Sequence, residues 1–150
     1  MIFTIIIGAM ILGYYMTVSM LTQNAINYIT NLPVGRWGIM AILVVVYLVL
    51  GCFMDQIAIL LLTLPLTFPL ATKLGFDPIW FGVIVIALAE IGLVTPPVGM
   101  NSYVVSSVSN VSLEKTFKGA GIMLIFEAAV LALLLAFPQI SLWLPSLMDK

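Results

Sequence analysis

A short stretch of this chain, AEIGLVTPPVGMNSY, concentrates backbone oxygens that can bind a cation. Pro96 and Pro97 have no N–H, so the carbonyls of Gly92 and Leu93 lose the donors that a continuous helix would supply. Gly92 and Gly99 leave the backbone free to turn on either side of the prolines. Carbonyls without donors are costly in hydrocarbon, and such breaks occur where protein buries them or where they line a polar cavity. The stretch therefore predicts a broken helix with a binding site at the break.

Three polar side chains are candidates to complete such a site. Thr95 and Asn101 add neutral side-chain oxygens close to the prolines. Carbonyl, hydroxyl and amide oxygens suit a hard cation, and a single nearby carboxylate, Asp55, suits a monovalent one. Broken helices near the middle of the membrane form ion sites of this kind in secondary transporters. The sequence thus predicts a sodium site, with sodium as a coupling ion and no other cofactor.

Asp55 stands near the middle of an apolar block, residues 39–74, that is too long for one membrane-spanning helix. The block can form two full spans, or a re-entrant hairpin whose tip, residues 51–56, ends inside the membrane. A carboxylate at membrane depth is costly unless it meets a cation, a partner or water. Asp55 therefore favours the hairpin, with its carboxylate in a protein-lined cavity.

Two glutamates and one cysteine are further candidates for chemistry. Glu90 precedes the predicted break and can act as a proton carrier or as a protonated packing residue. Glu127 lies within the last apolar block, where we expect it to pair with another helix. Cys52 is the only cysteine and there is no histidine, which excludes an internal disulfide and the usual zinc, haem and thiol-dyad chemistries. We expect Cys52 to be a small apolar filler.

The composition indicates the environment of these groups. Of the 150 residues 63% are hydrophobic and 7% are charged, and the mean hydropathy is +1.27. A soluble globular domain has about 25% charged residues, so the chain is predicted to be an all-α integral membrane protein. Its formal net charge of -1 provides no basic surface for nucleic acid.

Apolar blocks and the breaks between them predict the order of segments. The chain begins inside an apolar span, which indicates a fragment of a longer protein. Proline, glycine, tryptophan and charged residues mark the connections, and residues 109–119 are expected to form a loop leading into a helix. In order, we expect a transmembrane helix (1–22), an interfacial connector (23–38), the hairpin (39–72), the broken helix (79–109, link 95–99), a transmembrane helix (120–137) and an interfacial C-terminus (138–150).

Four motifs, in this order and spacing, resemble a known family: GCFMDQIAILLLTLPLTFP, KLGFDPIWFG, IGLVTPPVGMN and ISLWLPSL. They look like the C-terminal half of the large membrane (permease) subunit of tripartite ATP-independent periplasmic (TRAP) transporters, and the resemblance covers nearly the whole chain. It implies one inverted repeat of an elevator-type, sodium-driven importer of small organic anions such as dicarboxylates, in the bacterial inner membrane. It also implies partners within and beside the lipid bilayer: the N-terminal repeat of the same subunit, a small membrane subunit and a soluble periplasmic substrate-binding protein.

Carried onto this sequence, the resemblance implies an ion between the hairpin tip and the link. Glycine and proline would contribute backbone oxygens there. The positions that match the family's sodium site are Gly51, Asp55, Thr95, Pro96, Gly99 and Asn101. We add Gly92 and Pro97 to the predicted ion- and substrate-binding region, because they bracket the break.

Other classes of protein could use part of this pattern. A sodium/dicarboxylate-type symporter without a binding protein would need the same hairpin and break, and only its partners would distinguish it. A non-transporting membrane fragment is another alternative, which an upstream reading frame encoding the first half would identify. An intramembrane aspartyl protease requires two apposed membrane aspartates, and Asp55 is the only one within an apolar block. We therefore do not expect an enzyme.

Overall fold

The computed structural model describes residues 2–31, 33–96 and 99–148. Within these ranges the chain forms helices joined by short turns, and it contains no strand. The prediction of an all-α protein is therefore confirmed. The helices are α1 (Ile2–Val18), α2 (Leu21–Thr30), α3 (Arg36–Phe53), α4 (Gln56–Lys73), α5 (Pro78–Val94), α6 (Met100–Ser109), α7 (Leu113–Ala136) and α8 (Gln139–Met148).

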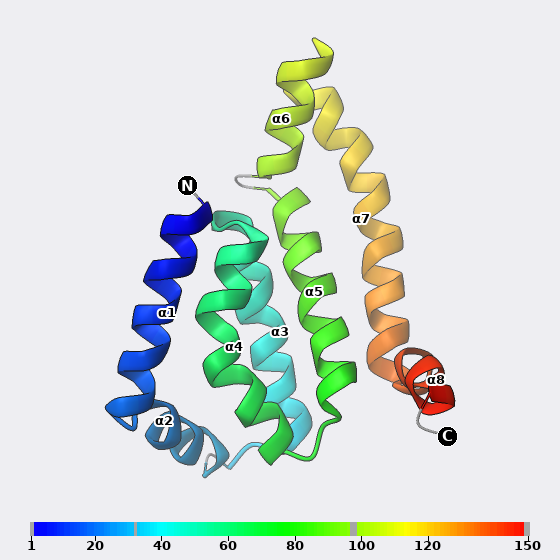
Figure 1. Ribbon diagram of the computed structural model, residues 1–150. Coiled ribbons are helices and arrows are strands. Elements are labelled where there is room, and N and C mark those ends of the chain that lie inside the picture. Colours follow the sequence, from blue (N-terminus) through cyan, green and yellow to red (C-terminus); the bar gives the residue numbers. More distant parts are fainter. Residues whose placement is uncertain (1, 32, 97–98, 149–150) are drawn as a thin grey trace.

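Helix α5 lies at the centre of the bundle (Figure 1). It packs against α3 and α4 on one side and against α7 on another, while α1 packs against the outer side of α4. Helix α6 continues beyond the end of α5 and packs against α7. The elements that carry the predicted site, α3 to α6, are therefore neighbours in space.

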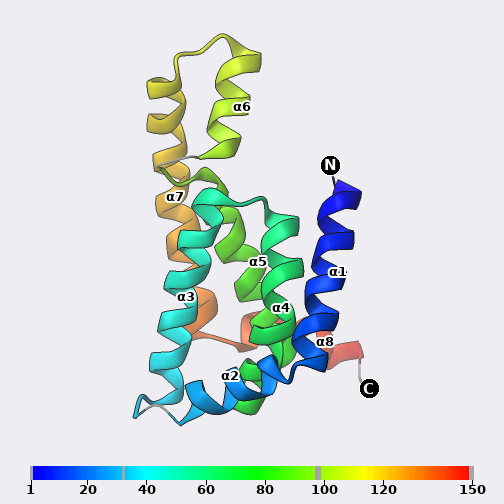
Figure 2. The same ribbon diagram turned by 90° about the vertical axis from the view of Figure 1, so that its left-hand side faces the viewer.

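The hairpin formed by α3 and α4 ends beside the break between α5 and α6. Figure 2 shows the α3–α4 turn level with this break, whereas α6 and the beginning of α7 extend beyond it. The 24 residues of α7 correspond to about 36 Å, and the 18 residues of α3 to about 27 Å, at the helical rise of about 1.5 Å per residue. The hairpin thus stops short of the beginning of α7. Because α3 and α4 are each long and apolar enough to cross a membrane, the re-entrant hairpin stays a prediction.

The turn of the hairpin is short. Met54 and Asp55 have extended backbone torsion angles, which end α3 and begin α4. The Asp55 carboxylate accepts a hydrogen bond from the Ile57 N–H at 3.1 Å, so Asp55 caps the N-terminus of α4. The turn is narrower than the predicted tip, residues 51–56, because Gly51 still belongs to α3 and Gln56 already begins α4.

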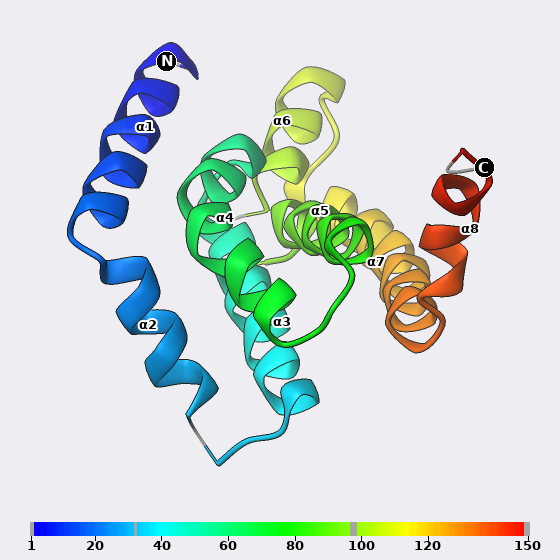
Figure 3. The ribbon, with the colours of Figure 1, turned by 60° about the horizontal axis from the view of Figure 1, so that its bottom comes forward.

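The predicted first span and its connector form a bent pair of helices. Helix α1 ends at Val18, Met20 adopts left-handed backbone angles, and α2 leaves at 70° to α1 (Figure 3). Helix α2 is amphipathic and covers the first half of the predicted connector, whose last residues already belong to α3. The Lys73 ammonium donates to the Asn27 side-chain oxygen at 2.6 Å. This bond attaches α2 to the end of α4.

Helix α7 begins at Leu113, within the segment that the sequence predicts to be a loop. Ser112 has extended N-cap angles, and Glu114 in the first turn interacts favourably with the helix dipole. Lys118 and Glu114, one turn apart, form an ion pair of 2.8 Å on the exposed surface. Polar residues thus form the first turns of α7, before its apolar part. Reading the sequence by its apolar runs alone did not predict this start.

Among the residues that the structure describes, three helices are long and apolar enough to cross a membrane. They are α3, α4 and α7, with mean hydropathies of 2.2, 1.4 and 2.3. The bent pair formed by α1 and α2 is a fourth candidate, and α5 is apolar but shorter. The chain is therefore a multi-pass membrane protein.

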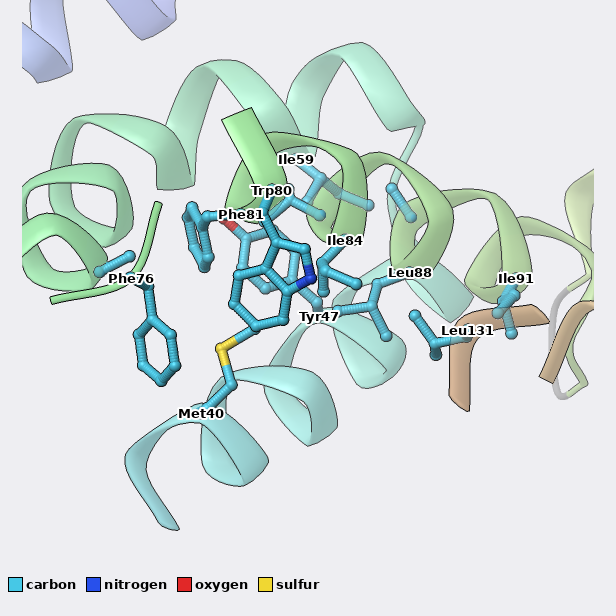
Figure 4. Packing of buried hydrophobic residues seen from close by; sticks show 13 residues of the cluster. Met40, Tyr47, Ile59, Phe76, Trp80, Phe81, Ile84, Leu88, Ile91 and Leu131 are labelled. Atoms are coloured by element: carbon cyan, nitrogen blue, oxygen red, sulfur yellow. The ribbon is translucent and has the colours of Figure 1, made fainter. Parts of the chain in front are cut away.

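The core of the bundle lies between α3, α4 and α5 and extends to α7 (Figure 4). Trp80, Tyr47 and Phe81 are its largest fully buried side chains. The Tyr47 hydroxyl lies 2.7 Å from Thr63 Oγ1 and 2.8 Å from Thr67 Oγ1. These bonds join the two arms of the hairpin and satisfy a buried hydroxyl that the sequence analysis did not single out.

A tryptophan satisfies one carbonyl that a proline leaves without a donor. Pro138 has no N–H, so the Leu134 carbonyl near the end of α7 lacks its i+4 partner. The Trp80 indole Nε1–H donates to this carbonyl at 2.8 Å. The same contact anchors the beginning of α5 to the end of α7.

Replacing Trp80 with phenylalanine should therefore destabilise the protein by about 1–2 kcal/mol or more, because the half-buried Leu134 carbonyl loses its donor and the smaller ring leaves a cavity in the core. Trp143 is exposed, so Trp143→Phe is the matched control and should leave stability unchanged. Thermal unfolding of the purified protein in detergent compares the two variants. Equal melting temperatures would contradict the role assigned to the indole N–H.

Candidate ion site at the hairpin turn and the helix break

The C-terminal ends of α3 and α5 meet at two glycines. A Cβ atom added to Gly51 would lie 2.7 Å from Gly92 Cα, and one added to Gly92 would overlap the backbone of Gly51. Both glycines are buried. Any side chain here would force the two backbones apart, so glycine is required for this close approach. The contact places the hairpin turn next to the helix break.

The last carbonyls of α3 lose their helical donors, because the chain turns away after Met54. The Leu50 carbonyl accepts from the Met54 N–H at 2.9 Å. No backbone N–H in the described parts of the chain donates to the carbonyls of Gly51, Cys52 or Phe53. Such orphan oxygens at a helix C-terminus are available to a ligand.

At the end of α5 the two predicted orphan carbonyls behave differently. The Gly92 carbonyl has lost its i+4 donor to Pro96, but it accepts from the Thr95 N–H at 3.1 Å in a tighter turn. For the Leu93 carbonyl the corresponding residue is Pro97, which lies outside the described residues. Among the N–H groups that the structure describes, none donates to Leu93. Within the described residues, the Leu93 carbonyl thus has no backbone donor at this end of α5.

Thr95 and Cys52 face the same space between the hairpin and α7. Both line a cavity of about 310 Å³ whose other wall includes Leu124 and Ala128 of α7. Thr95 Oγ1 donates to the Ile91 carbonyl at 2.6 Å, so its lone pairs stay free to accept or to bind a cation.

Cys52 connects the hairpin to the link, although the sequence predicts only an apolar filler. Its thiol lies 3.2 Å from the Leu48 carbonyl and 3.7 Å from the Pro96 carbonyl, and it can donate to either. In the described part of the chain, the contact of the Cys52 thiol with the Pro96 carbonyl joins the end of α3 to the link. The sequence offers one signal for this contact, which is that Cys52 directly follows Gly51.

Asp55 is half-buried at the turn. Its carboxylate accepts from the Ile57 N–H, and in the described ranges it forms no hydrogen bond to the link. The proximity of Asp55 to the link residues therefore stays a prediction. One carboxylate oxygen caps α4, and the other keeps its lone pairs for a ligand.

Two predicted residues on the far side of the break face α7. Gly99 has left-handed angles (φ 53°, ψ 58°) and lies against the Phe117 ring. Asn101 lines a cavity of about 500 Å³ between α6 and α7, together with Ser102 and Lys115. The turn residues Gly51 and Asp55 do not line this cavity. The structure thus gathers Gly51, Gly92, Thr95 and Pro96 in one place and puts Gly99 and Asn101 toward α7.

The electrostatics at the meeting point favour a cation. Each helix C-terminus carries a partial negative charge of roughly 0.5 elementary charge, and α3 and α5 both end here. Helix α4 begins at the same turn, and its N-terminus carries the opposite partial charge next to the Asp55 carboxylate that caps it. Asp55, next to the end of α3, adds a formal negative charge. The ligands on offer are oxygens from the backbone, a hydroxyl and a carboxylate, which hard cations prefer.

Glu90 and Glu127 line a cavity of about 230 Å³ between α5 and α7, and Glu127 also lines the cavity that Asn101 lines. Glu90 is exposed and Glu127 is half-buried. Within the described residues, the Glu127 Oε2 atom is buried and has no hydrogen-bond partner. The expected pairing of Glu127 with another helix is therefore not formed by the described part of the chain.

These features define a multi-pass α-helical membrane protein in which a helical hairpin packs its turn against the break of a discontinuous helix. Residues 1–140 match the family described as the tripartite ATP-independent periplasmic transporter, DctM component. The chain belongs to this family.

Several large permease proteins are similar to this chain along most of its length. The C4-dicarboxylate TRAP transporter large permease protein DctM of Pseudomonas aeruginosa is 36% identical over 97% of the chain, which spans 34% of that relative. The sialic acid TRAP transporter large permease protein SiaM of Vibrio cholerae is 34% identical over 95% of the chain and 33% of its own length. The isethionate TRAP transporter permease protein DctMQ of Oleidesulfovibrio alaskensis is 34% identical over 85% of the chain. The chain thus spans about a third of the length of the first two relatives.

Proposed function

We propose that this chain is the C-terminal part of a large permease subunit that imports small organic anions with sodium as the coupling ion. The observation that carries the proposal is the meeting of the α3 and α5 C-termini at Gly51 and Gly92. It places the last carbonyl oxygens of two helices beside each other, and within the described residues those of Gly51, Cys52 and Phe53 have no backbone donor. A cation next to each helix C-terminus gains about 0.3–1 kcal/mol, and up to about 2 kcal/mol where it is partly buried.

The proposed substrate class rests on the chemistry that the relatives share. Their names refer to a C4-dicarboxylate, a sialic acid and isethionate. These are small anions with carboxylate or sulfonate groups and otherwise different structures. A bound cation would offset part of the negative charge of any of them, which couples their binding to sodium. We propose only the class of anion. The other parts of the transporter would select the individual substrate.

The proposal includes partners outside this chain. The chain covers about a third of the relatives, so we expect the rest of the subunit to form the other side of the substrate site. A small membrane subunit and a periplasmic binding protein would complete the transporter in the bacterial inner membrane. The exposed apolar faces of α1, α6 and α7 would contact lipid and these partners.

Transport by the reconstituted complex tests the proposal. Proteoliposomes should contain this chain with the remaining parts of the subunit and the small membrane subunit, and should receive the binding protein loaded with a C4-dicarboxylate, sialic acid or isethionate. We expect uptake of at least one anion under an inward sodium gradient and none when potassium replaces sodium. Equal uptake in potassium would exclude sodium coupling, and failure with all organic anions would exclude the import function.

The chain alone should not transport. Carbonyls without donors at the turn and the break would face lipid or detergent instead of a second repeat, and half of the substrate site would be missing. The same proteoliposomes prepared with this chain only should show uptake equal to empty vesicles. Sodium-dependent uptake above that background would mean that the described helices form a complete pathway.

A further inference from the structure

Helices α3 and α5 are in close contact near their C-terminal ends, where the proposed ion would bind to both helices. Gly51 is the third residue from the end of α3, and Gly92 holds the same place in α5. Around them the two helices touch through backbone atoms, with no side chain in between. A backbone contact has little freedom to adjust, because it contains no rotatable side chain. The distance between the carbonyls that follow is therefore determined by this pair.

A second contact links the same two segments just beyond the glycines. The Cys52 thiol reaches the Pro96 carbonyl, 44 residues later in the chain. A thiol is a weak hydrogen-bond donor. The Pro96 carbonyl beside it can accept a hydrogen bond, and Pro96 has no N–H of its own to donate. It adds a side-chain contact between the turn and the break to the backbone contact of the glycine pair, beside its shorter contact to the Leu48 carbonyl of its own helix.

We propose that Gly51, Gly92 and Cys52 are positioning residues that keep the hairpin turn and the helix break in register, so that carbonyls of both helix ends point to one ion. The inference rests on the proposed sodium site. Ion binding by carbonyl oxygens requires a narrow range of distances, so a shift of one helix end along or away from the other weakens binding. The three residues themselves need not touch the ion for this effect.

A consequence is that α3 follows α5 when the protein changes conformation. Helix α3 packs more extensively against α5 than against α4, its partner in the hairpin. Helix α6 instead packs mainly on α7. The turn of the hairpin therefore stays with α5, whereas α6 stays with α7.

Alanine at either glycine tests the positioning role. Gly51→Ala and Gly92→Ala should raise the sodium concentration for half-maximal uptake by about tenfold or more, as changes in residues that support ligands do at other metal sites. The half-saturating anion concentration, measured at saturating sodium, should stay unchanged. Gly82→Ala, also in α5, is the matched control because nothing lies within 4 Å of the added Cβ; it should not alter sodium dependence.

Cysteine variants test the same inference without adding volume. Cys52→Ala removes the donor and should raise the half-saturating sodium concentration, whereas Cys52→Ser keeps a donor and should restore most of the wild-type value. This pair keeps the test decisive if the alanine variants at the glycines fail to fold. Sodium-dependent wild-type uptake with unchanged sodium half-saturation in Gly51→Ala, Gly92→Ala and Cys52→Ala would overturn the positioning role alone. Sodium-independent wild-type uptake would instead refute the underlying site.

Discussion

Replacing Asp55 with asparagine is expected to raise the sodium concentration for half-maximal uptake by about tenfold or more. The reason is that an interaction with a charged partner contributes about 1.5–3 kcal/mol, and about 1.4 kcal/mol corresponds to a factor of ten in affinity. The substitution isolates the charge. Asparagine caps a helix N-terminus about as well as aspartate does, so the bond to the Ile57 N–H and the start of α4 should be retained.

Asp77 offers a matched control for this experiment. It caps the N-terminus of α5 through the N–H groups of Ile79 and Trp80, at the opposite end of that helix from the break. Asp77→Asn should leave sodium dependence unchanged. Uptake measured against sodium concentration in proteoliposomes with the complete transporter compares the variants. An unchanged half-saturation in well-folded Asp55→Asn would remove this carboxylate from the site.

Thr95→Val extends the test to a neutral ligand and should have a smaller effect. The substitution removes the hydroxyl but leaves the bond of the Thr95 N–H to the Ile91 carbonyl, so the end of α5 should persist. If Thr95 binds the ion, its substitution should cost about 1 kcal/mol of binding free energy, which raises the half-saturating sodium concentration about fivefold. If the break serves packing only, Thr95→Val should lower stability and leave sodium dependence unchanged. Glu90→Gln, outside the proposed site, should alter sodium dependence much less.

The largest effect on stability is expected for Gly99→Ala. Gly99 has left-handed backbone angles, which cost a residue with a Cβ about 1–2 kcal/mol. The new Cβ would also lie 2.5 Å from the Phe117 ring and 3.2 Å from the Val94 carbonyl. With overpacking included, we expect the free energy of unfolding to fall by about 2–4 kcal/mol.

Thermal unfolding in detergent measures this loss, and a second substitution separates its causes. Gly99→Ala combined with Phe117→Leu should recover the part due to overlap and keep the part due to backbone strain. Gly119→Ala in α7 is the control, because a Cβ there meets no atom within 4 Å. A melting temperature for Gly99→Ala equal to that of the control would show that the break tolerates a side chain.

Some features of this protein depend on local chemistry, so the sequence alone determines them. A proline removes its own N–H wherever it stands, and the glycine at 99 permits left-handed angles, so the interruption between α5 and α6 can be located without coordinates. The apolar composition similarly predicts the all-α membrane fold, which is confirmed, and the four motifs predict the family, which is also confirmed. The beginning of α7 was missed, since an ion pair one turn apart stabilises a polar helix start that an apolar search ignores.

Contacts between distant segments were decided only by the tertiary structure. The predicted ion- and substrate-binding region includes Gly51 and Gly92, but nothing in the sequence indicates that their backbones touch. Likewise, nothing near Cys52 or Trp80 indicates the Pro96 and Leu134 carbonyls that they approach. Asn101 follows the prolines closely, yet the packing of α6 on α7 turns it toward a cavity that the hairpin turn does not line. The physical reason is the distance along the chain over which each effect acts. Missing donors and backbone angles act within about one helical turn, whereas the meeting of two helix ends depends on the volumes of all the side chains packed between the helices.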